Sequence, residues 1–351
     1  MTDPFVPPRC PNRLCHKHRS PTPNFYWHRG AYIVACRAEP IPRFRCKSCR
    51  RSFSRQTFRL DRWDKRPDRN VELFLLLTSG VGLRQCARTL GMGTAAVQQK
   101  FRKLARNLRL LNRNLLRQLP PNRCYLLDEI ETFEQKSICP LTVPVLIEKE
   151  SLAVIATDSA PIRRMTRRGS QRQRWMERQE KKHGRRKDHG RRCVRKIFGR
   201  FQRLLAGQKA LLITDDKAIY RTLCRRLMGD RVQHLTYSSK LARTTFNPLF
   251  PINLTEAMLR DNLGRLRRRS WLVSKRGNRL SLQLEMFVAY RNWLRPRTNQ
   301  GDPNLCPGMV LGIVLRRLEV DELLAWRQDW REYSIHPASS SAAETVRQQV
   351  A

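Results

Sequence analysis

The chain changes character at Pro120-Pro121, where one kind of periodicity gives way to another. Before this pair, residues 69–118 place apolar side chains at intervals near 3.6 residues, which predicts helices. After it come short apolar runs that resemble strands in length and composition, at 124–130, 143–147, 152–156, 210–213 and 232–236. Two adjacent prolines interrupt either kind of element. We therefore expect a domain boundary here, with a helical domain over 61–119.

Longer segments with helical spacing separate or follow these runs, at 171–205, 218–227, 255–268, 280–293 and 310–331. Three close strands followed by alternating strands and helices predict an α/β domain, a mixed sheet with flanking helices. This domain is expected over 120–335, with a basic helical insertion over 163–205. The Ser- and Ala-rich residues 336–351 are expected to form a flexible tail.

Positive charge is the strongest compositional feature, and it is localised. Basic side chains outnumber acidic ones by 71 to 29, which gives a formal charge of +42. The surplus lies in four blocks, 1–60, 84–118, 163–203 and 260–279, and the rest of the chain nets to zero. Charge of this size opposes compaction unless a polyanion neutralises it. Nucleic acid is the natural partner, because each neutralised phosphate releases counterions.

Several protein classes are excluded on composition. Purely apolar runs are only a handful of residues long, as at 73–77, so we expect no membrane-spanning segment and no membrane partner. The N-terminus lacks the basic-then-apolar layout of a signal peptide. The odd count of 11 cysteines argues against a disulfide scaffold and for reduced thiols. A cytoplasmic location is therefore expected.

Four cysteines in the first 60 residues have the spacing of a zinc site. Cys10 and Cys15 form one close pair and Cys46 and Cys49 another, and two such pairs complete a tetrahedral set of thiolates. The segment is too polar to fold on a core of its own, so we expect a metal-stapled module over 1–60, with one structural zinc per chain. Four unrelated thiols remain an alternative, as does replacement of Cys15 by His16 or His18.

Residues 83–104 have the pattern of a helix-turn-helix. A first helix ends at Gly91, a residue suited to a left-handed cap, and Thr94 is expected to cap the second. The second helix turns Ala95, Val97, Phe101 and Leu104 toward the core. Its other face carries polar side chains that suit base edges and phosphates in the major groove: Gln98, Gln99, Lys100, Arg102 and Lys103. An ordinary helical hairpin with a solvated face is the alternative.

Two carboxylate positions stand out in the predicted sheet. Asp128 interrupts an apolar strand, where an unpaired charge is costly unless it faces metal or solvent. Asp215 and its neighbour Asp216 follow a strand directly, at the end where open α/β sheets place their chemistry. A third side chain is expected to join the two aspartates in one site. It would come from the next helix, where Asn253 and Glu256 lie three residues apart and near one face. Glu285 is expected to be a surface residue.

The order of these parts resembles bacterial insertion-sequence transposases of the DDE type, in which a zinc ribbon and a helix-turn-helix precede the catalytic domain. The resemblance covers roughly residues 8–295. It is carried by the cysteine pairs, by the aspartates at 128 and 215, and by the basic block that ends near Lys275. It implies a ribonuclease H-like fold, two catalytic Mg²⁺ or Mn²⁺ ions, and nicking and strand transfer at the ends of an insertion sequence. It also implies a homodimer or higher oligomer on DNA, with the protein at the bacterial nucleoid when bound.

Carried over residue by residue, Asp128 matches the first aspartate and Asp215 the second. The third position, usually Glu, falls at Asn253 by the register of the basic block, and Glu256 is the other candidate. The resemblance assigns phosphate contacts to basic residues after this position: Arg260, Arg265, Arg267, Arg268, Arg269 and Lys275. Because asparagine offers a metal no charge, a non-catalytic DNA-binding protein, decayed or repurposed from a transposase, remains the alternative.

Overall fold

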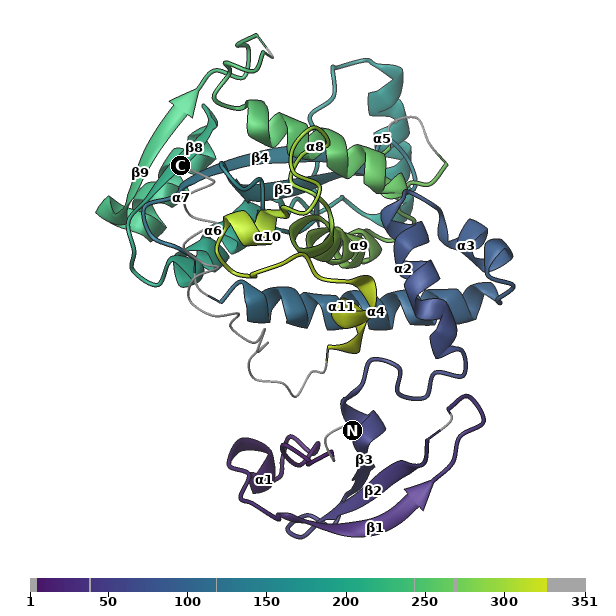
Figure 1. Cartoon of the computed structure of the whole chain (residues 1–351). Coiled ribbons are helices and arrows are strands. Elements are labelled where there is room, and N and C mark those ends of the chain that lie inside the picture. Colours follow the sequence, from purple (N-terminus) through teal and green to yellow (C-terminus); the bar gives the residue numbers. More distant parts are fainter. Residues whose placement is uncertain (1–4, 38, 118, 243, 268–270, 327–351) are drawn as a thin grey trace.

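The computed structural model describes residues 5–37, 39–117, 119–242, 244–267 and 271–326. A mixed sheet forms its centre (Figure 1). The strands, in sequence order, are β4 (Cys124–Phe133), β5 (Pro140–Glu148), β6 (Val154–Thr157), β7 (Ala160–Pro161), β8 (Ala210–Asp215) and β9 (Val232–Tyr237). They are arranged β6-β5-β4-β8-β9, with β7 beside β5. All five predicted strands are confirmed.

Strand β4 is central in this sheet. It runs antiparallel to β5, which is antiparallel to β6, whereas β8 runs parallel to β4 and β9 parallel to β8. The pairing of β4 with β8 ends at Leu127 and Thr214, each directly before a predicted catalytic aspartate. The two aspartates are therefore brought together at the point where β4 and β8 stop pairing.

The two faces of the sheet pack against different helices. One face is covered by α8 (Phe250–Asn262) and α9 (Gly277–Ala289). The π-helical turn Tyr290–Leu294 directly follows α9. The other face is covered by α6 (Gly190–Leu205) and α7 (Ala218–Met228). Along a strand successive side chains alternate between faces. Since Leu126 and Ile130 of β4 pack on the α8 side, Asp128 faces α8 as well.

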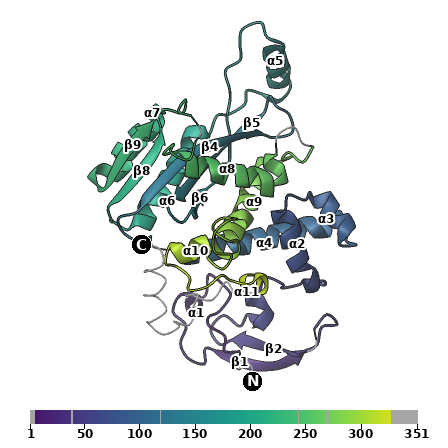
Figure 2. The same ribbon diagram turned by 45° about the horizontal axis from the view of Figure 1, so that its top comes forward.

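Three predicted helices differ from the observed ones. The helix predicted over 255–268 begins and ends earlier, as α8. The segment over 171–205 forms two helices, α5 (Gln171–His183) and α6, because no side chain of α5 is buried and only α6 has an apolar face against the sheet. Figure 2 shows α5 projecting away from the sheet. The segment over 310–331 gives two short helices, α10 (Pro307–Val310) and α11 (Val320–Ala325), and its residues 327–331 lie outside the described part.

The N-terminal module contains a three-stranded antiparallel sheet of β1 (Tyr26–Tyr32), β2 (Ile41–Cys46) and β3 (Ser52–Ser54). A short helix α1 (His16–Arg19) precedes it, and a 3₁₀ turn (Arg55–Phe58) follows. Phe25, Phe44 and Phe53 form its small core beside the cysteines. These aromatic side chains therefore stabilise the module and are not exposed for stacking on bases.

The predicted helical domain consists of a 3₁₀ turn (Pro67–Arg69) and the helices α2 (Asn70–Thr78), α3 (Leu83–Thr89) and α4 (Thr94–Leu115). Leu104, Leu108 and Leu111 of α4 belong to the same apolar cluster as Tyr125 and Leu127 of β4. Helix α4 also packs along α9 (Figure 1). The secondary structure thus changes at Pro120, but the two segments share one core. Residues 336–351, the predicted tail, lie outside the described residues.

Candidate functional site

Asp128 and Asp215 lie side by side on the face of the sheet that α8 covers. Both come from central, parallel strands, and each directly follows the last residue through which β4 pairs with β8. The Asp215 side chain is 8% exposed and that of Asp128 24%. Two carboxylates at such depth repel each other and lose hydration, so each requires a compensating positive charge.

The nearest positive charge is the ammonium group of Lys217, which no motif in the sequence marks as part of a site. Its Nζ lies 3.3 Å from Asp215 Oδ2, 3.5 Å from Asp128 Oδ1 and 3.2 Å from Glu129 Oε2. Burial acts to lower the pKa of Lys217, but Glu129 and the two aspartates outweigh it and raise the pKa well above its ordinary value. Lys217 is therefore a cation held among three carboxylates.

Burial raises the pKa of Asp128, and the charge of Asp215 adds to this effect. The Lys217 ammonium and a hydrogen bond from the Glu129 backbone N–H to Asp128 Oδ1 (2.7 Å) act in the opposite direction. The pKa nevertheless stays above its usual range. A second cation near these oxygens would therefore be favourable.

Glu256 approaches the pair from α8. On a helix, residues three and four apart share a face, and Glu256 shares one with Ile252 and Leu259, which are buried against the sheet. Burial, with a contribution from Asp128, raises the pKa of Glu256 to about 7. Its Oε2 pairs with Arg260 at 3.3 Å, whereas its Oε1 is buried without a hydrogen-bond partner among the described residues.

Asn253, the other candidate for the third position, lies almost one turn earlier on α8 and is half-buried. Within the described part of the chain, its side chain makes no hydrogen bond to either aspartate, and its backbone N–H bonds Leu249 O at 3.1 Å. Arg260 pairs with Glu256, so the basic residue expected to touch phosphate also contacts this carboxylate.

The three carboxylates have the chemistry of ligands for divalent metal ions, but among the described residues it is the four N-terminal cysteines, not these carboxylates, whose ligand atoms gather within 4.8 Å of one another. Magnesium prefers carboxylate oxygens, and the side chains of Asp128, Asp215 and Glu256 provide them on one side of the sheet. The unpartnered Oε1 of Glu256 and the raised pKa values of Asp128 and Glu256 both indicate a local deficit of positive charge, even with Lys217 in place.

The four cysteines of the N-terminal module converge. Their sulfur atoms all lie within 4.8 Å of one another, with Cys10 Sγ 3.5 Å from Cys49 Sγ and Cys15 Sγ 3.9 Å from Cys46 Sγ. Tetrahedral zinc with Zn–S bonds of about 2.3 Å separates its sulfur ligands by roughly 3.8 Å, so this group can hold zinc. His18 Nδ1 instead bonds Cys10 O at 2.7 Å.

Helices α3 and α4 occupy the segment predicted as a helix-turn-helix, and Gly91 between them has the expected left-handed φ of 60°. Thr94 is the first residue of α4, and Gly93 precedes it at the cap. Val97, Phe101 and Leu104 are buried as predicted, but Ala95 is exposed. Gln98 and Gln99 are exposed, while Arg102 and Lys103 are half-buried.

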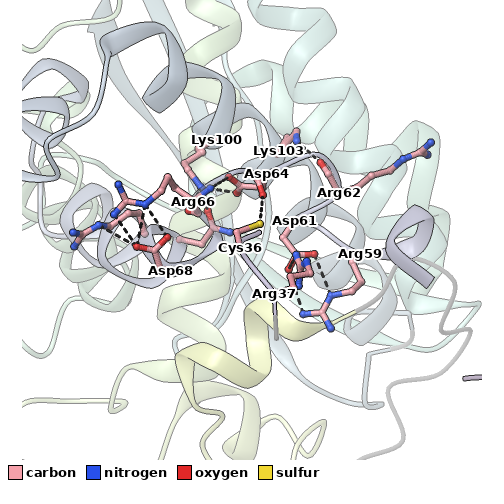
Figure 3. Close-up of polar contacts among 12 residues, drawn as sticks. Cys36, Arg37, Arg59, Asp61, Arg62, Asp64, Arg66, Asp68, Lys100 and Lys103 are labelled. Atoms are coloured by element: carbon pink, nitrogen blue, oxygen red, sulfur yellow. Dashed lines mark hydrogen bonds and ion pairs between the residues drawn. The ribbon is translucent and has the colours of Figure 1, made fainter. Parts of the chain in front are cut away.

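Lys100 does not belong to the exposed face of α4, contrary to the prediction. Its Nζ is buried and contacts Asp64 Oδ2 (2.5 Å), Arg66 O (2.6 Å) and Asn70 Oδ1 (2.9 Å). Figure 3 shows Lys100 and Lys103 reaching the segment that joins the N-terminal module to α2. With its hydrogen bonds satisfied inside the protein, Lys100 stabilises this junction and is unavailable to DNA.

The basic residues that follow the third catalytic candidate, and were predicted to contact phosphate, differ in exposure. Arg267 is exposed and donates to Asp261 O at 3.0 Å, and Lys275 is exposed. Arg265 is half-buried beneath α4, with its guanidinium 5.9 Å from the centre of the Phe101 ring. Arg268 and Arg269 lie outside the described residues.

Glu285 is not a surface residue, contrary to the prediction. It is 6% exposed and bonds Arg109 Nε at 3.2 Å and Asn112 Nδ2 at 3.4 Å, both on α4. These contacts join α9 to α4 and form no part of the carboxylate group around Lys217.

None of the described helices combines the length and the apolar character needed to cross a bilayer. No protein-family model and no curated protein matches the sequence. Among solved structures, the chain is similar to a cryo-EM structure of a simian T-cell lymphotropic virus intasome in complex with PP2A regulatory subunit B56 gamma. The identity is 14%, the TM-score is 0.26, and the match covers 67% of this chain and 70% of that one. This similarity is too low to carry an argument.

Proposed function

We propose that the protein is a DNA transposase of the DDE type, which nicks the ends of an insertion sequence and transfers the freed 3′ ends to target DNA. The observation that carries this proposal is the convergence of Asp128 and Asp215 from adjacent parallel strands, faced by a buried, partly unpartnered Glu256. The strand order β6-β5-β4-β8-β9, in which β5 alone runs opposite to the other four, supports a ribonuclease H-like domain.

We assign Asp128, Asp215 and Glu256 as the carboxylates that would hold two Mg²⁺ or Mn²⁺ ions. Ions bound there would activate the attacking water or 3′-hydroxyl and stabilise the leaving 3′ oxygen. Glu256 is preferred to Asn253 because its buried side chain interacts with Asp128 and has one oxygen unsatisfied. Asn253 remains the second candidate.

The protein's own side chains prepare this site for DNA. Lys217 offsets part of the negative charge of the carboxylates in the free protein and so limits their mutual repulsion. Arg260 restrains Glu256 through their ion pair. The exposed Gln98 and Gln99 of α4 are proposed to read base edges, and the ribbon to contact the same element ends. Joining two ends requires at least two copies of the chain on DNA.

The catalytic assignment is tested with purified protein, Mg²⁺ and duplexes containing the DNA that flanks its gene. Asp215→Asn is expected to abolish nicking and strand transfer, while Asp216→Asn, at an exposed neighbour, retains both. Two further variants test which residue is the third metal ligand. Glu256→Gln is expected to abolish cleavage, and Asn253→Ala is expected to retain it. The opposite result would assign Asn253. DNA binding without any cleavage by the wild-type chain would favour the non-catalytic alternative.

A further inference from the structure

A basic groove separates α4 from the segment that follows α8. It is a cavity of about 470 Å³. Its cationic lining comprises Arg102 of α4 and, from the opposite wall, Arg265, Lys275, Arg276 and Arg279. Leu83, Gln98 and Phe101 also line it, and none of the described residues that line it is acidic. We call this feature the arginine groove.

Close backbone packing builds this groove. A β-carbon at Gly264 would lie 2.5 Å from Gly80 O, so the segment after α8 can approach the α2–α3 turn only because residue 264 is glycine. Nearby, Gln283 Nε2 of α9 donates to Leu77 O of α2 at 3.2 Å. These contacts fix the opposite wall against the helix-turn-helix, so the groove has a defined shape.

Within the described part of the chain, the cations of the groove have no counter-ions. Among the described residues, none of the five cationic side chains forms an ion pair, and the Nε of Arg102 is buried without a hydrogen-bond partner. Burial, together with the charge of Arg279, lowers the pKa of Arg265 to about 10. Like charges held together at partial burial destabilise the free protein, so their clustering is expected where an anion binds.

The groove lies near the carboxylates. Thr132 Oγ1 of β4 is 3.5 Å from Arg265 O, and Thr132 is four residues beyond Asp128 on the same strand. Four strand residues span about 13 Å. This length corresponds to the rise of roughly four base pairs of DNA at 3.4 Å each. A duplex can therefore contact the groove and the carboxylates within one helical turn.

We propose that the arginine groove binds the phosphate backbone of duplex DNA and holds it between the helix-turn-helix and the catalytic carboxylates. This inference rests on the proposed function and specifies how the DNA recognised by α4 is held in register with the reacting strand. A phosphate backbone fits because it supplies several negative charges in a row to guanidinium groups, which bond phosphate oxygens strongly. The contact is independent of base sequence.

The test measures binding of a 30-base-pair duplex in EDTA at several salt concentrations, so that no cleavage is needed. The double variant Arg276→Gln/Arg279→Gln is expected to bind about tenfold or more weakly. Its slope of log affinity against log salt should be smaller by about 1.8, because two phosphate contacts are lost. The matched control, Arg225→Gln/Arg226→Gln, removes two exposed arginines of α7 and is expected to change neither quantity.

A melting measurement without DNA separates a binding role from a structural one. Removing like charges should leave the Tm of the groove variant unchanged or raise it. Unchanged affinity and salt slope in the groove variant would overturn the inference, as would equal losses in the control or no DNA binding by the wild type. The proposed function fails separately, if the wild type binds DNA through the groove but never cleaves it with Mg²⁺.

Discussion

The ammonium nitrogen of Lys217 lies 3.3 Å from a carboxylate oxygen of Asp215, two residues before it in the chain. The same nitrogen reaches Asp128 and Glu129 on the neighbouring strand. One cation is therefore shared by both aspartates proposed to bind metal and offsets part of their charge. Divalent ions and the Lys217 ammonium then compete for the same oxygens, and this competition can be measured.

Lys217→Met is expected to lower the stability of the metal-free protein and to strengthen its affinity for Mg²⁺. Breaking a buried ion pair costs about 3–5 kcal/mol, but the Lys217 side chain is 41% exposed, so we expect a loss of about 1–2 kcal/mol. Thermal melting in EDTA and with increasing Mg²⁺ measures both effects. The exposed Lys209→Met is the control. A smaller Mg²⁺-induced rise in Tm for Lys217→Met than for wild type would contradict this competition.

Glu256 should make the stability of the metal-free protein fall as pH rises. In the unfolded chain it ionises near pH 4.5, whereas burial and Asp128 raise its pKa in the folded chain to about 7. Between these values the folded state binds a proton that the unfolded state does not, so stability is lost across this window, by up to about 3 kcal/mol. Urea unfolding in EDTA at pH 4.5 and 7.5, for wild type and Glu256→Gln, isolates this loss. Parallel pH profiles for the two proteins would show that Glu256 keeps an ordinary pKa.

The N-terminal module is expected to contain about one tightly bound zinc ion per chain. Cys46→Ser should lose this zinc and unfold the module, because its small phenylalanine core depends on the metal-held loops. Metal analysis of the purified protein measures the stoichiometry. Cys36→Ser, at a cysteine outside the cluster, should retain the zinc. Zinc-free wild-type protein with an intact fold would contradict the assignment.

Lys100→Met is expected to destabilise the protein by about 3–5 kcal/mol, because it leaves the Asp64 carboxylate, 9% exposed, without its cation. Chemical unfolding measures this loss. Gln99→Ala, at the neighbouring exposed position, should change stability by no more than about 0.5 kcal/mol. If Lys100→Met were as stable as wild type and bound DNA more weakly, the original assignment of Lys100 to the DNA-facing surface would be restored.

The central strands could be predicted because their signal is local. The apolar runs of β4 and β8 identify them, and a charged residue within or directly after such a run marks Asp128 and Asp215. The cysteine cluster was equally accessible, since the spacing of its two pairs is sufficient to indicate metal. In each case the information lies within a few neighbouring residues.

Partners distant in sequence could not be predicted in this way. Lys100 is buried in an ion pair with Asp64, which lies in an irregular segment without periodicity. Glu285 is buried against Arg109 and Asn112, which lie on a helix far earlier in the chain. The rotation of α8, which turns Glu256 toward Asp128, is set by the docking of Ile252 and Leu259. Sequence spacing places Asn253 and Glu256 near the same face of the helix, so it could not decide which of them faces the aspartates.

Cleavage of gene-flanking DNA by Asp128→Ala beside the wild type, with Mg²⁺ and with EDTA, decides whether these carboxylates are catalytic. We predict that the wild type nicks the element ends only with Mg²⁺, and that Asp128→Ala binds the DNA but leaves it intact. Nicking by Asp128→Ala at the wild-type rate would contradict the assignment of these carboxylates as the catalytic centre.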